Sequence, residues 1–464
     1  MSAAPASLPN QTIKLSGNNA AILADLIRPG AGRGLDFVIL DELRKRTGIS
    51  PSEIHRFAVG EMLANSLDTN AIEIYVTIKN TGDFDEITVK DNGSKKIGLD
   101  EVELILDFLN KASSKRGFLR VSRGYLGNAL KCLFGYSYAL ADSKGLKPPD
   151  SVVYSHGVEY RIRLIPDVVR EVIGSKIVNT KIDRGSFNAF TICFPAIDHA
   201  STIRKGIYDV IFASSMVNPT RRIHYDLWDS EGDLGEPHEA FNPRRDTSVL
   251  WYKEDEFVTL FFDFIRVAPE TQLREFLSLF RGFTGKKVQR EILQEISTTA
   301  NHDPSPQFFP ITKIRGVPRR AVKRLFNSMA KRAKPISKRS TPKVLGAVGE
   351  EHFEKIKERY GWRHLKYTIM KGRKETYWLI DRWAGFPFLV ELAVFDRNED
   401  GDGLKVFQCV NFMASMEDIF SKIFNIKYRL GRVGIKETTP VTVLAHLVCP
   451  VLKWLNYGKS GLYE

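Results

Sequence analysis

The stretch Glu61-Met-Leu-Ala-Asn65-Ser-Leu-Asp68 decides how the rest of this chain is interpreted. We predict that it lies in a helix that begins near residues 51–53, because Glu61, Asn65 and Asp68 then recur at i, i+4 and i+7 and share one face. The opposite face is apolar and can pack against a sheet; its residues are Phe57, Met62, Leu63 and Leu67. Two carboxylates and an amide on one face are costly to bury unless something binds them, so the stretch predicts a binding cleft.

Two strands joined by a turn follow this helix. Residues 71–79 and 86–90 alternate apolar and polar side chains, and Asn80-Thr-Gly-Asp between them predicts a hairpin. The second strand ends in Asp91-Asn-Gly93. An acid at the end of a strand, followed by a turn that contains glycine, stands where sheets commonly present binding groups.

A glycine-containing turn opens another predicted helix. A helix over 100–109 and a basic segment over 110–120 lead into Ser122-Arg-Gly124-Tyr-Leu-Gly127-Asn-Ala-Leu-Lys131. Glycines before a helix leave backbone N–H groups open to phosphate, and the helix dipole adds attraction. A strand over 186–194, introduced by Arg184-Gly185, follows later.

Taken together, these elements resemble the ATP site of the GHKL superfamily, which includes gyrase, histidine kinases and MutL. The shared features are an ExxxNxxD helix, a DNG turn after a strand, a GxxGxA turn that opens a helix, and a Gly-Ser strand start. The resemblance implies an α+β fold that begins with a Bergerat-type ATPase α/β sandwich. It also implies ATP and Mg²⁺ as cofactors.

The resemblance assigns a role to each residue of the helix and of the first turn. It implies that Glu61 is the general base that activates water, that Asn65 is a ligand of Mg²⁺, and that Asp68 orients neighbouring groups. Asp91 would accept a hydrogen bond from the adenine amino group, and Gly93 would allow the base to approach closely. Phosphoryl transfer to water needs a metal, backbone donors and a carboxylate, and these residue types supply them.

The remaining nucleotide contacts are implied for the later turns. The lid over the phosphates would contain Gly124, Tyr125, Leu126, Gly127 and Asn128. Ser186 would support the adenine end through water, with Thr191 as the alternative. Two positions depart from the family pattern, because Lys95 and Ala129 stand where glycines are usual. The pattern therefore predicts ATP binding more firmly than fast ATP hydrolysis.

The rest of the chain resembles B subunits of topoisomerase VI and their bacterial relatives. The resemblance is carried by residues 217–227 and 247–252, and by the later segments 348–351, 386–395, 406–411 and 441–446. It implies three domains: an ATP-binding domain over 1–255, a helical, basic domain of the helix-two-turns-helix kind over 256–340, and an α/β transducer-like domain over 341–464. The alternating Val, Leu and Phe residues of the last domain independently predict strands.

In that family a lysine of the transducer reaches the γ-phosphate. Lys453 is the candidate in this chain, with Lys459 second, although strict counting from Gly458 puts Val451 at the position. Family members also continue past this position into a long helix that docks the DNA-cleaving A subunit, whereas this sequence ends at Glu464.

Charge is concentrated in one part of the chain. The 464 residues carry a net charge of +13, and residues 304–349 contain twelve Lys and Arg and no acid. A basic surface favours a polyanionic partner, so we expect phosphate contacts with double-stranded DNA. The residues expected to make them are Lys313, Arg315, Arg319, Arg320, Lys323 and Arg324. The alternative is a solvated flexible linker.

Cysteine usage and hydropathy favour a cytoplasmic protein, and with the expected DNA contacts we expect it to be nucleoid-associated. Four cysteines lie far apart in apolar surroundings without a CxxC pair, which is typical of reduced core residues. No run of eighteen apolar residues occurs, so we expect no membrane association.

Two functions remain open at this point. The first is an ATPase subunit resembling topoisomerase VI B, in which ATP drives dimerisation of two chains and so controls DNA capture or strand passage. No DNA-cleavage centre is visible in the sequence, so cutting would need an A-like partner with Toprim and winged-helix parts. The second is a nucleotide-gated DNA clamp or scaffold, like MutL or MORC proteins, without topoisomerase activity. A histidine kinase is disfavoured, because no helix with a phosphorylatable His precedes the ATP site.

Overall fold

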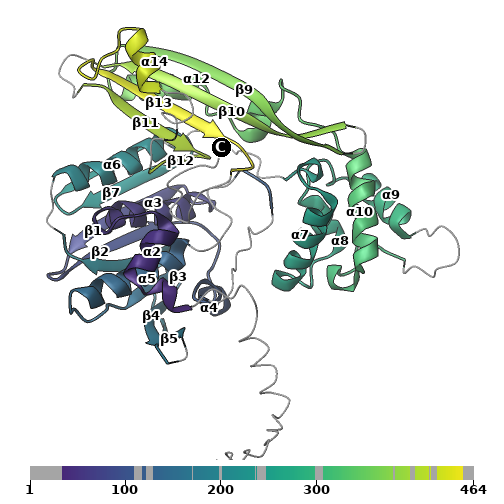
Figure 1. Cartoon of the computed structure of the whole chain (residues 1–464), viewed down its shortest axis with the longest axis horizontal. Coiled ribbons are helices and arrows are strands. Elements are labelled where there is room, and N and C mark those ends of the chain that lie inside the picture. The colour runs from purple at the N-terminus through teal and green to yellow at the C-terminus, as the bar shows by residue number, and fades with distance from the viewer. Residues whose placement is uncertain are drawn as a thin grey trace, which may run out of the picture.

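The structure is a computed structural model. It describes residues 34–108, 118–121, 129–169, 171–197, 201–235, 237, 247–297, 307–379, 382–397, 403–416, 419 and 426–452. Figure 1 shows an N-terminal part made of a sheet and helices, a helical part beside it, and a C-terminal sheet that extends over both.

An eight-stranded sheet forms the N-terminal part. Its strand order is β5-β4-β3-β6-β2-β1-β7-β8, and neighbouring strands are antiparallel except for the parallel pair β1 and β7. The strands are β1 (Glu73–Asn80), β2 (Phe84–Asp91), β3 (Ser151–Ser155), β4 (Val158–Asp167), β5 (Val172–Lys181), β6 (Asn188–Pro195), β7 (Arg222–Leu227) and β8 (Ser230–Leu234). The predicted hairpin of residues 71–90 is confirmed by the pairing of β1 with β2.

Helices pack on this sheet, and α3 is the one that carries the polar row. The helices are α2 (Leu40–Thr47), α3 (Ile54–Leu67), α4 (Leu99–Ile105), α5 (Ala129–Ser143) and α6 (Ser201–Met216). The predicted helix start is confirmed, because a 3₁₀ turn over Pro51–Glu53 leads directly into α3. The apolar side of α3 is buried, including Phe57, Met62 and Leu63. The α/β sandwich expected from the sequence is therefore present.

One predicted helix differs from the observed one at its end. The helix expected over 100–109 ends at Ile105. Helix ends depend on local capping and tertiary packing, which the apolar period does not specify.

The helical part has an aromatic core. Its helices are α7 (Glu254–Val267), α8 (Leu273–Ser278), α9 (Lys286–Ser297) and α10 (Arg319–Arg332). Phe257, Phe276 and Phe280 are fully buried and in mutual contact. The 3₁₀ turn Val249–Trp251 belongs to the same core, although the predicted boundary at residue 255 places it with the first domain. The three predicted domain ranges stay predictions.

Helix α10 corrects one sequence interpretation. A solvated linker was the alternative for the basic segment, but residues 319–332 form a helix with a buried apolar face. That face contains Val322, Leu325, Phe326 and Met329. Its apolar residues recur at the helical period, which the run of positive charge obscured.

The C-terminal part is a five-stranded sheet in the order β12-β11-β13-β10-β9. Its strands are β9 (His364–Leu379), β10 (Arg382–Asp396), β11 (Lys405–Val410), β12 (Met413–Ala414) and β13 (Val441–Val448). Its helices are α11 (Thr341–Leu345), α12 (Glu350–Arg359) and α14 (Ile426–Arg432). The predicted strands near 386, 406 and 441 are confirmed, whereas β9 was not expected.

A buried carboxylate holds this C-terminal sheet to the segment before α12. Glu391 of β10 is 1% exposed, and its carboxylate accepts hydrogen bonds from the N–H groups of Val348 (3.0 Å) and Gly349 (2.9 Å). Tyr367 and His446 Nδ1 donate to it as well, at 2.8 and 3.0 Å. Burial alone would raise the pKa of Glu391, but the bonds from His446 and the two N–H groups lower it. The carboxylate is thus kept charged inside the sheet.

The described residues contain no helix that is long and apolar enough to cross a bilayer. The four cysteines are free; Cys132, Cys409 and Cys449 are buried and Cys193 is partly buried. Burial raises the pKa of Cys132 to about 12 and that of Cys193 to about 11, so these thiols are unreactive core groups.

Asp85, near the beginning of β2, is a second buried acid that holds this strand in place. It pairs with His55 Nε2 at 3.2 Å and accepts hydrogen bonds from Trp228 Nε1 (3.1 Å) and the N–H of Ile197 (3.2 Å). Burial alone would raise the pKa of Asp85, but these bonds lower it from 3.8 to about 2. Because the folded value is the lower one, the stabilisation is complete above pH 3.8 and is lost as the pH falls toward about 2.

We expect Asp85→Asn to lower the free energy of unfolding by roughly 2–4 kcal/mol near neutral pH, because one charged partner of a buried network is removed. The difference in the free energy of unfolding between wild type and variant should decrease as the pH falls from 3.8 toward about 2. Urea unfolding across this range measures both effects. Asp83→Asn, in the exposed hairpin turn, is the control. A difference in unfolding free energy that does not change with pH would contradict the lowered pKa of Asp85.

Candidate functional site

The polar row of α3 lies along the partly buried side of the helix. Glu61, Asn65 and Asp68 are each partly exposed, whereas Met62, Leu63 and the residues between them are buried. Asp68 is also the C-cap of the helix, and its N–H donates hydrogen bonds to backbone carbonyls of the last turn of α3. The structure therefore brings the three predicted residues to one face, as the spacing requires.

Asp91, the last residue of β2, is tied to the helix beside that row. Its side chain is 3% exposed, and Oδ2 accepts a hydrogen bond from Ser66 Oγ at 2.8 Å. Oδ1 accepts a hydrogen bond from the N–H of Gly93 at 2.9 Å. Because Ser66 follows Asn65 directly, this hydrogen bond ties Asp91 to the turn of α3 that carries Asn65.

Asn188, which the sequence analysis missed, completes this network from β6. It pairs in register with Asp91, and its Nδ2 contacts Asp91 Oδ1 at 3.5 Å. The same amide donates to the carbonyls of Gly93 and Lys95, both at 3.2 Å. No motif could have indicated it, because its role follows from strand register.

The residues predicted to support the adenine end lie outside that network. Ser186 is exposed and precedes β6. Thr191 instead bonds Thr88 across the two strands at 2.9 Å. Among the described residues of this strand, Asn188 is the side chain that reaches Asp91.

Gly93 is required by the close approach of its neighbours. A Cβ at this position would lie 2.8 Å from Asp91 Oδ1 and 2.9 Å from Thr69 Oγ1. The carbonyl of Gly93 also contacts His156 Nε2 at 3.0 Å. The turn after β2 is therefore shaped by contacts that leave no room for a side chain.

Lys95, the departure from the glycine pattern, does not enter the site. Its ammonium pairs with Glu101 at 2.6 Å, and its side chain is 68% exposed. Only its backbone carbonyl takes part in the network, through Asn188. The substitution is thus accommodated by directing the side chain into solvent.

Lys131, on the first turn of α5, is a second residue that sequence reasoning did not single out. Its side chain is fully buried, and its ammonium donates to the backbone carbonyl of Asp107. Burial lowers the pKa of Lys131, while nearby Asp107 opposes the change. This contact joins the residues that follow α4 to the beginning of α5.

The predicted lid residues Gly124, Tyr125, Leu126, Gly127 and Asn128 lie outside the described residues, as does Lys453.

The side chains on α3 suit the predicted magnesium ion by their chemistry. Mg²⁺ prefers oxygen ligands and keeps several waters, so that one or two protein oxygens and substrate phosphates complete its shell. Asn65 supplies an amide oxygen, and Glu61 lies one turn away on the same face. Bound there, the ion would neutralise phosphate charge.

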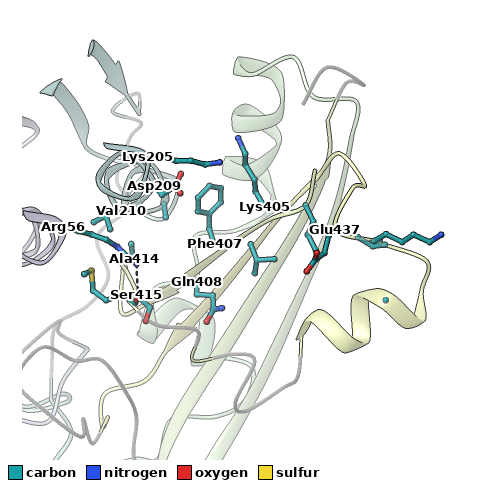
Figure 2. Close-up of a pocket in the computed structure, with 17 residues that line it drawn as sticks. Arg56, Lys205, Asp209, Val210, Lys405, Phe407, Gln408, Ala414, Ser415 and Glu437 are labelled. Atoms are coloured by element: carbon teal, nitrogen blue, oxygen red, sulfur yellow. Dashed lines mark hydrogen bonds between the residues drawn. The ribbon is translucent and has the colours of Figure 1, made fainter. Parts of the chain in front are cut away.

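A separate cavity lies at the joint between the N-terminal part and the C-terminal sheet. It measures about 780 Å³. Figure 2 shows Lys205 and Asp209 of α6 facing Lys405 and Phe407 of β11. Arg56 of α3 reaches its edge and donates to the carbonyl of Met416 at 2.9 Å. This cavity is not the predicted nucleotide site, but it places one residue of α3 in direct contact with the C-terminal part.

Several of the predicted DNA contacts lie against acids in the structure. Lys313 and Arg315 contact Glu270 at 3.7 and 2.5 Å, and Lys323 contacts Glu254 at 2.7 Å. The other predicted residues are the exposed Arg319 and Arg320 and the partly buried Arg324.

No protein-family model and no curated protein matches this chain. Among solved structures, the ATPase region of Saccharomyces cerevisiae topoisomerase II bound to ICRF-187 (dexrazoxane) matches 89% of this chain and 78% of that chain, at 12% identity and a TM-score of 0.36. The Aquifex aeolicus MutL ATPase domain complexed with ADP matches 86% and 91%, at 12% identity and a TM-score of 0.31. The B subunit of DNA gyrase from Myxococcus xanthus matches 96% and 90%, at 9% identity and a TM-score of 0.34. Because these TM-scores are low, the function proposed below depends on this chain's own residues.

We expect Gly93→Ala to lower the free energy of unfolding by about 1–3 kcal/mol, because the new methyl group would displace Asp91 or Thr69. Gly98→Ala is the matched control, since a Cβ there meets nothing within 4 Å and φ is −89°. It should change stability by less than about 0.5 kcal/mol. Urea unfolding compares the two variants, and equal stabilities would contradict the described turn.

Proposed function

We propose that this chain is an ATP-binding and ATP-hydrolysing DNA clamp subunit that resembles the B subunit of topoisomerase VI. The observation that carries the proposal is the hydrogen bond from Ser66 to the buried Asp91. It joins the helix with Glu61 and Asn65 to the turn that contains Gly93. Residues far apart in the sequence thereby form one site with an acceptor, a metal ligand and a base.

The adenine role of Asp91 is supported by its hydrogen bonds. A carboxylate has about four lone-pair positions. The donors from Ser66 and Gly93 occupy one on each oxygen, and Asn188 approaches Oδ1 more weakly at 3.5 Å. The carboxylate is thus fixed in orientation and retains acceptor capacity for an amino group.

Glu61 is the proposed general base. A base must lie within reach of the water that attacks the γ-phosphate, and a partly exposed carboxylate on the same face as the metal ligand meets this requirement. The bound ion would supply charge neutralisation, while Glu61 would accept the proton of the water. Lys453 is proposed as the contact to the γ-phosphate.

We expect Glu61→Ala to reduce ATP hydrolysis by about 100-fold or more, because proton acceptance is lost. ATP binding should persist, since the adenine contacts remain. Phosphate release and equilibrium binding of a fluorescent ATP analogue measure the two steps. Glu231→Ala removes an exposed carboxylate on β8 and serves as the control. Normal ATP hydrolysis by Glu61→Ala would show that Glu61 is not the general base.

Asp91→Asn should weaken ATP binding itself, by about tenfold or more, because an amide replaces one acceptor oxygen with a donor. The variant should therefore raise the dissociation constant for the nucleotide, in contrast to Glu61→Ala. Isothermal titration with a non-hydrolysable ATP analogue distinguishes the two. An unchanged dissociation constant would exclude Asp91 as the adenine contact.

The DNA-binding part of the proposal rests on the basic face at the start of α10. Arg319 is exposed at this end of the helix, whereas Lys313, Arg315 and Lys323 contact acids. We propose Arg319 as the main phosphate contact. ATP-dependent pairing of two chains would then close the clamp around a duplex.

We expect Arg319→Ala to bind duplex DNA more weakly and to reduce the slope of log affinity against log salt by about 1, since each phosphate contact releases counterions. Arg315→Ala is the control and should change the slope less, because Arg315 contacts Glu270. Fluorescence anisotropy at several salt concentrations gives the slopes. A wild-type affinity that does not depend on salt would overturn the phosphate contacts.

The second candidate is a MutL-like or MORC-like clamp without topoisomerase activity. The acidic partners of Lys313, Arg315 and Lys323 favour its scaffold form, because they reduce the basic surface available to a duplex. Co-purification with a Toprim and winged-helix subunit would favour the topoisomerase-like function. Its absence, together with ATP-dependent dimerisation, would favour the second candidate.

A further inference from the structure

The cavity between the N-terminal part and the C-terminal sheet has no role in the function proposed above. Its volume is about 780 Å³. Ligand pockets of proteins commonly measure about 300–1,000 Å³. One wall comes from α3 and α6, and the other comes from β11 and residues 414–416 and 431–437. Among the described residues that line the cavity, none is a predicted nucleotide contact. The cavity is therefore a separate space with the size of a site for a small organic molecule.

Positively charged side chains predominate among the charged groups of this cavity. The described lining includes four cations and two acids, namely Arg56, Lys205, Lys405, Lys436, Asp209 and Glu437. Because two acids compensate at most two cations, an excess of positive charge remains. Such an excess in a concave place concentrates ligands of the opposite charge. The cavity therefore favours an anion.

Two of these lysines extend from opposite walls. Figure 2 shows Lys205 of α6 and Lys405 of β11 reaching toward each other beside the ring of Phe407. Each ammonium group carries three hydrogen-bond donors. Two ammonium groups from different parts of the fold can therefore bind one acidic group together.

Part of the wall is apolar. Phe407 is 9% exposed, and the centre of its ring lies 5.2 Å from that of Phe212 on α6. Val210 of α6 and Ile435, which follows α14, also line the cavity. Apolar walls with a few polar groups that set orientation are typical of sites for small organic ligands. The cavity thus suits a molecule that combines a flat apolar part with an acidic group.

Hydrogen bonds hold two sides of the cavity in place. Arg56 donates to the carbonyl of Met416 at 2.9 Å, which fixes the residues after β12 to α3. The N–H of Leu404 donates to the carbonyl of Glu437 at 2.7 Å, which fixes the residues after α14 to the beginning of β11. A preorganised site loses less conformational freedom on binding than a flexible one. These bonds therefore make the cavity part of the folded architecture.

We propose that this cavity is a binding site for a small organic anion with an aromatic part, of the class of aromatic carboxylates, sulfonates and phosphates. The aromatic part lies against Phe407 and Val210, and Lys205 and Lys405 bind the acidic group. The ligand contacts both parts of the chain at once, so it favours the arrangement in which α6 faces β11. This site does not depend on ATP binding or hydrolysis.

The test uses the full chain and two fluorescent probes that differ in charge. Anilinonaphthalene sulfonate is an aromatic anion, and phenylnaphthylamine has the same rings without the sulfonate. Lys205→Gln and Lys405→Gln each remove one cation, and Phe407→Leu removes the flat ring but keeps an apolar side chain. Lys79→Gln, at an exposed position of β1 that does not line the cavity, is the matched control. Unfolding temperatures close to that of the wild type show that a variant is folded.

We expect each lysine variant to raise the dissociation constant of the sulfonate probe by about tenfold, because one charge-assisted hydrogen bond is lost. The same variants should leave the dissociation constant of the uncharged probe unchanged. Phe407→Leu should weaken the binding of both probes several-fold, since both lose the aromatic contact. Lys79→Gln should behave as wild type, and a saturating non-hydrolysable ATP analogue should not displace the sulfonate probe.

The inference is overturned if the wild type binds the sulfonate probe no more tightly than the uncharged probe. It is also overturned if Lys205→Gln and Lys405→Gln bind the sulfonate probe as the wild type does, or if Lys79→Gln loses as much affinity as they do. Displacement by the ATP analogue would place the probe in the nucleotide site and would overturn the inference as well. A chain that does not bind ATP contradicts the proposed function alone, because the probe titrations need no nucleotide.

Discussion

The hydrogen bond between Ser66 and Asp91 is the constraint on which the site depends. It fixes a helix to the end of a strand, so that α3 and the turn at Gly93 are held together. Asp91 is buried, and a buried carboxylate without donors would be strongly destabilising. The donors that stabilise the fold are therefore the groups that orient the carboxylate, and stability and binding geometry come from the same contacts.

Hydrogen bonds also connect the N-terminal part, including helix α3, to the C-terminal sheet. Arg56 donates to the carbonyl of Met416, and Asn218, after α6, donates to the carbonyl of Phe412 at 2.8 Å. The N–H of Phe412 in turn donates to His446 Nε2 at 3.1 Å. His446 is bonded to the buried Glu391. A continuous set of hydrogen bonds thus runs from the N-terminal part into the centre of the second sheet. Movement of either part must break or preserve these bonds together.

Much of the fold was predictable because it depends on local period and turn residues. The helix that carries Glu61, the hairpin before Asp91 and three strands of the C-terminal sheet follow from spacing alone. Asn188 was not predictable, because its contact with Asp91 results from the register of two strands, and the two residues lie 97 positions apart in the sequence. The hydrogen bond from the N–H of Leu119 to Tyr252 Oη was missed for the same reason, since no local pattern marks a contact between distant segments. The sequence predicts which residues are chemically suitable, and the tertiary structure decides which of them meet.

The pairing of charged residues is the feature that the sequence predicts least completely. Residues 304–349 contain twelve cations and no acid, yet the structure brings Glu254, Glu270 and Glu295 to several of them. A cation that already has an acidic partner gains less from a phosphate, because the first partner must be released or remains as a repelling charge. Net charge therefore overstates the strength of a DNA surface. In the proposed contact with DNA, the exposed Arg319 at the start of α10 would therefore carry more of the attraction than its share of the total charge indicates.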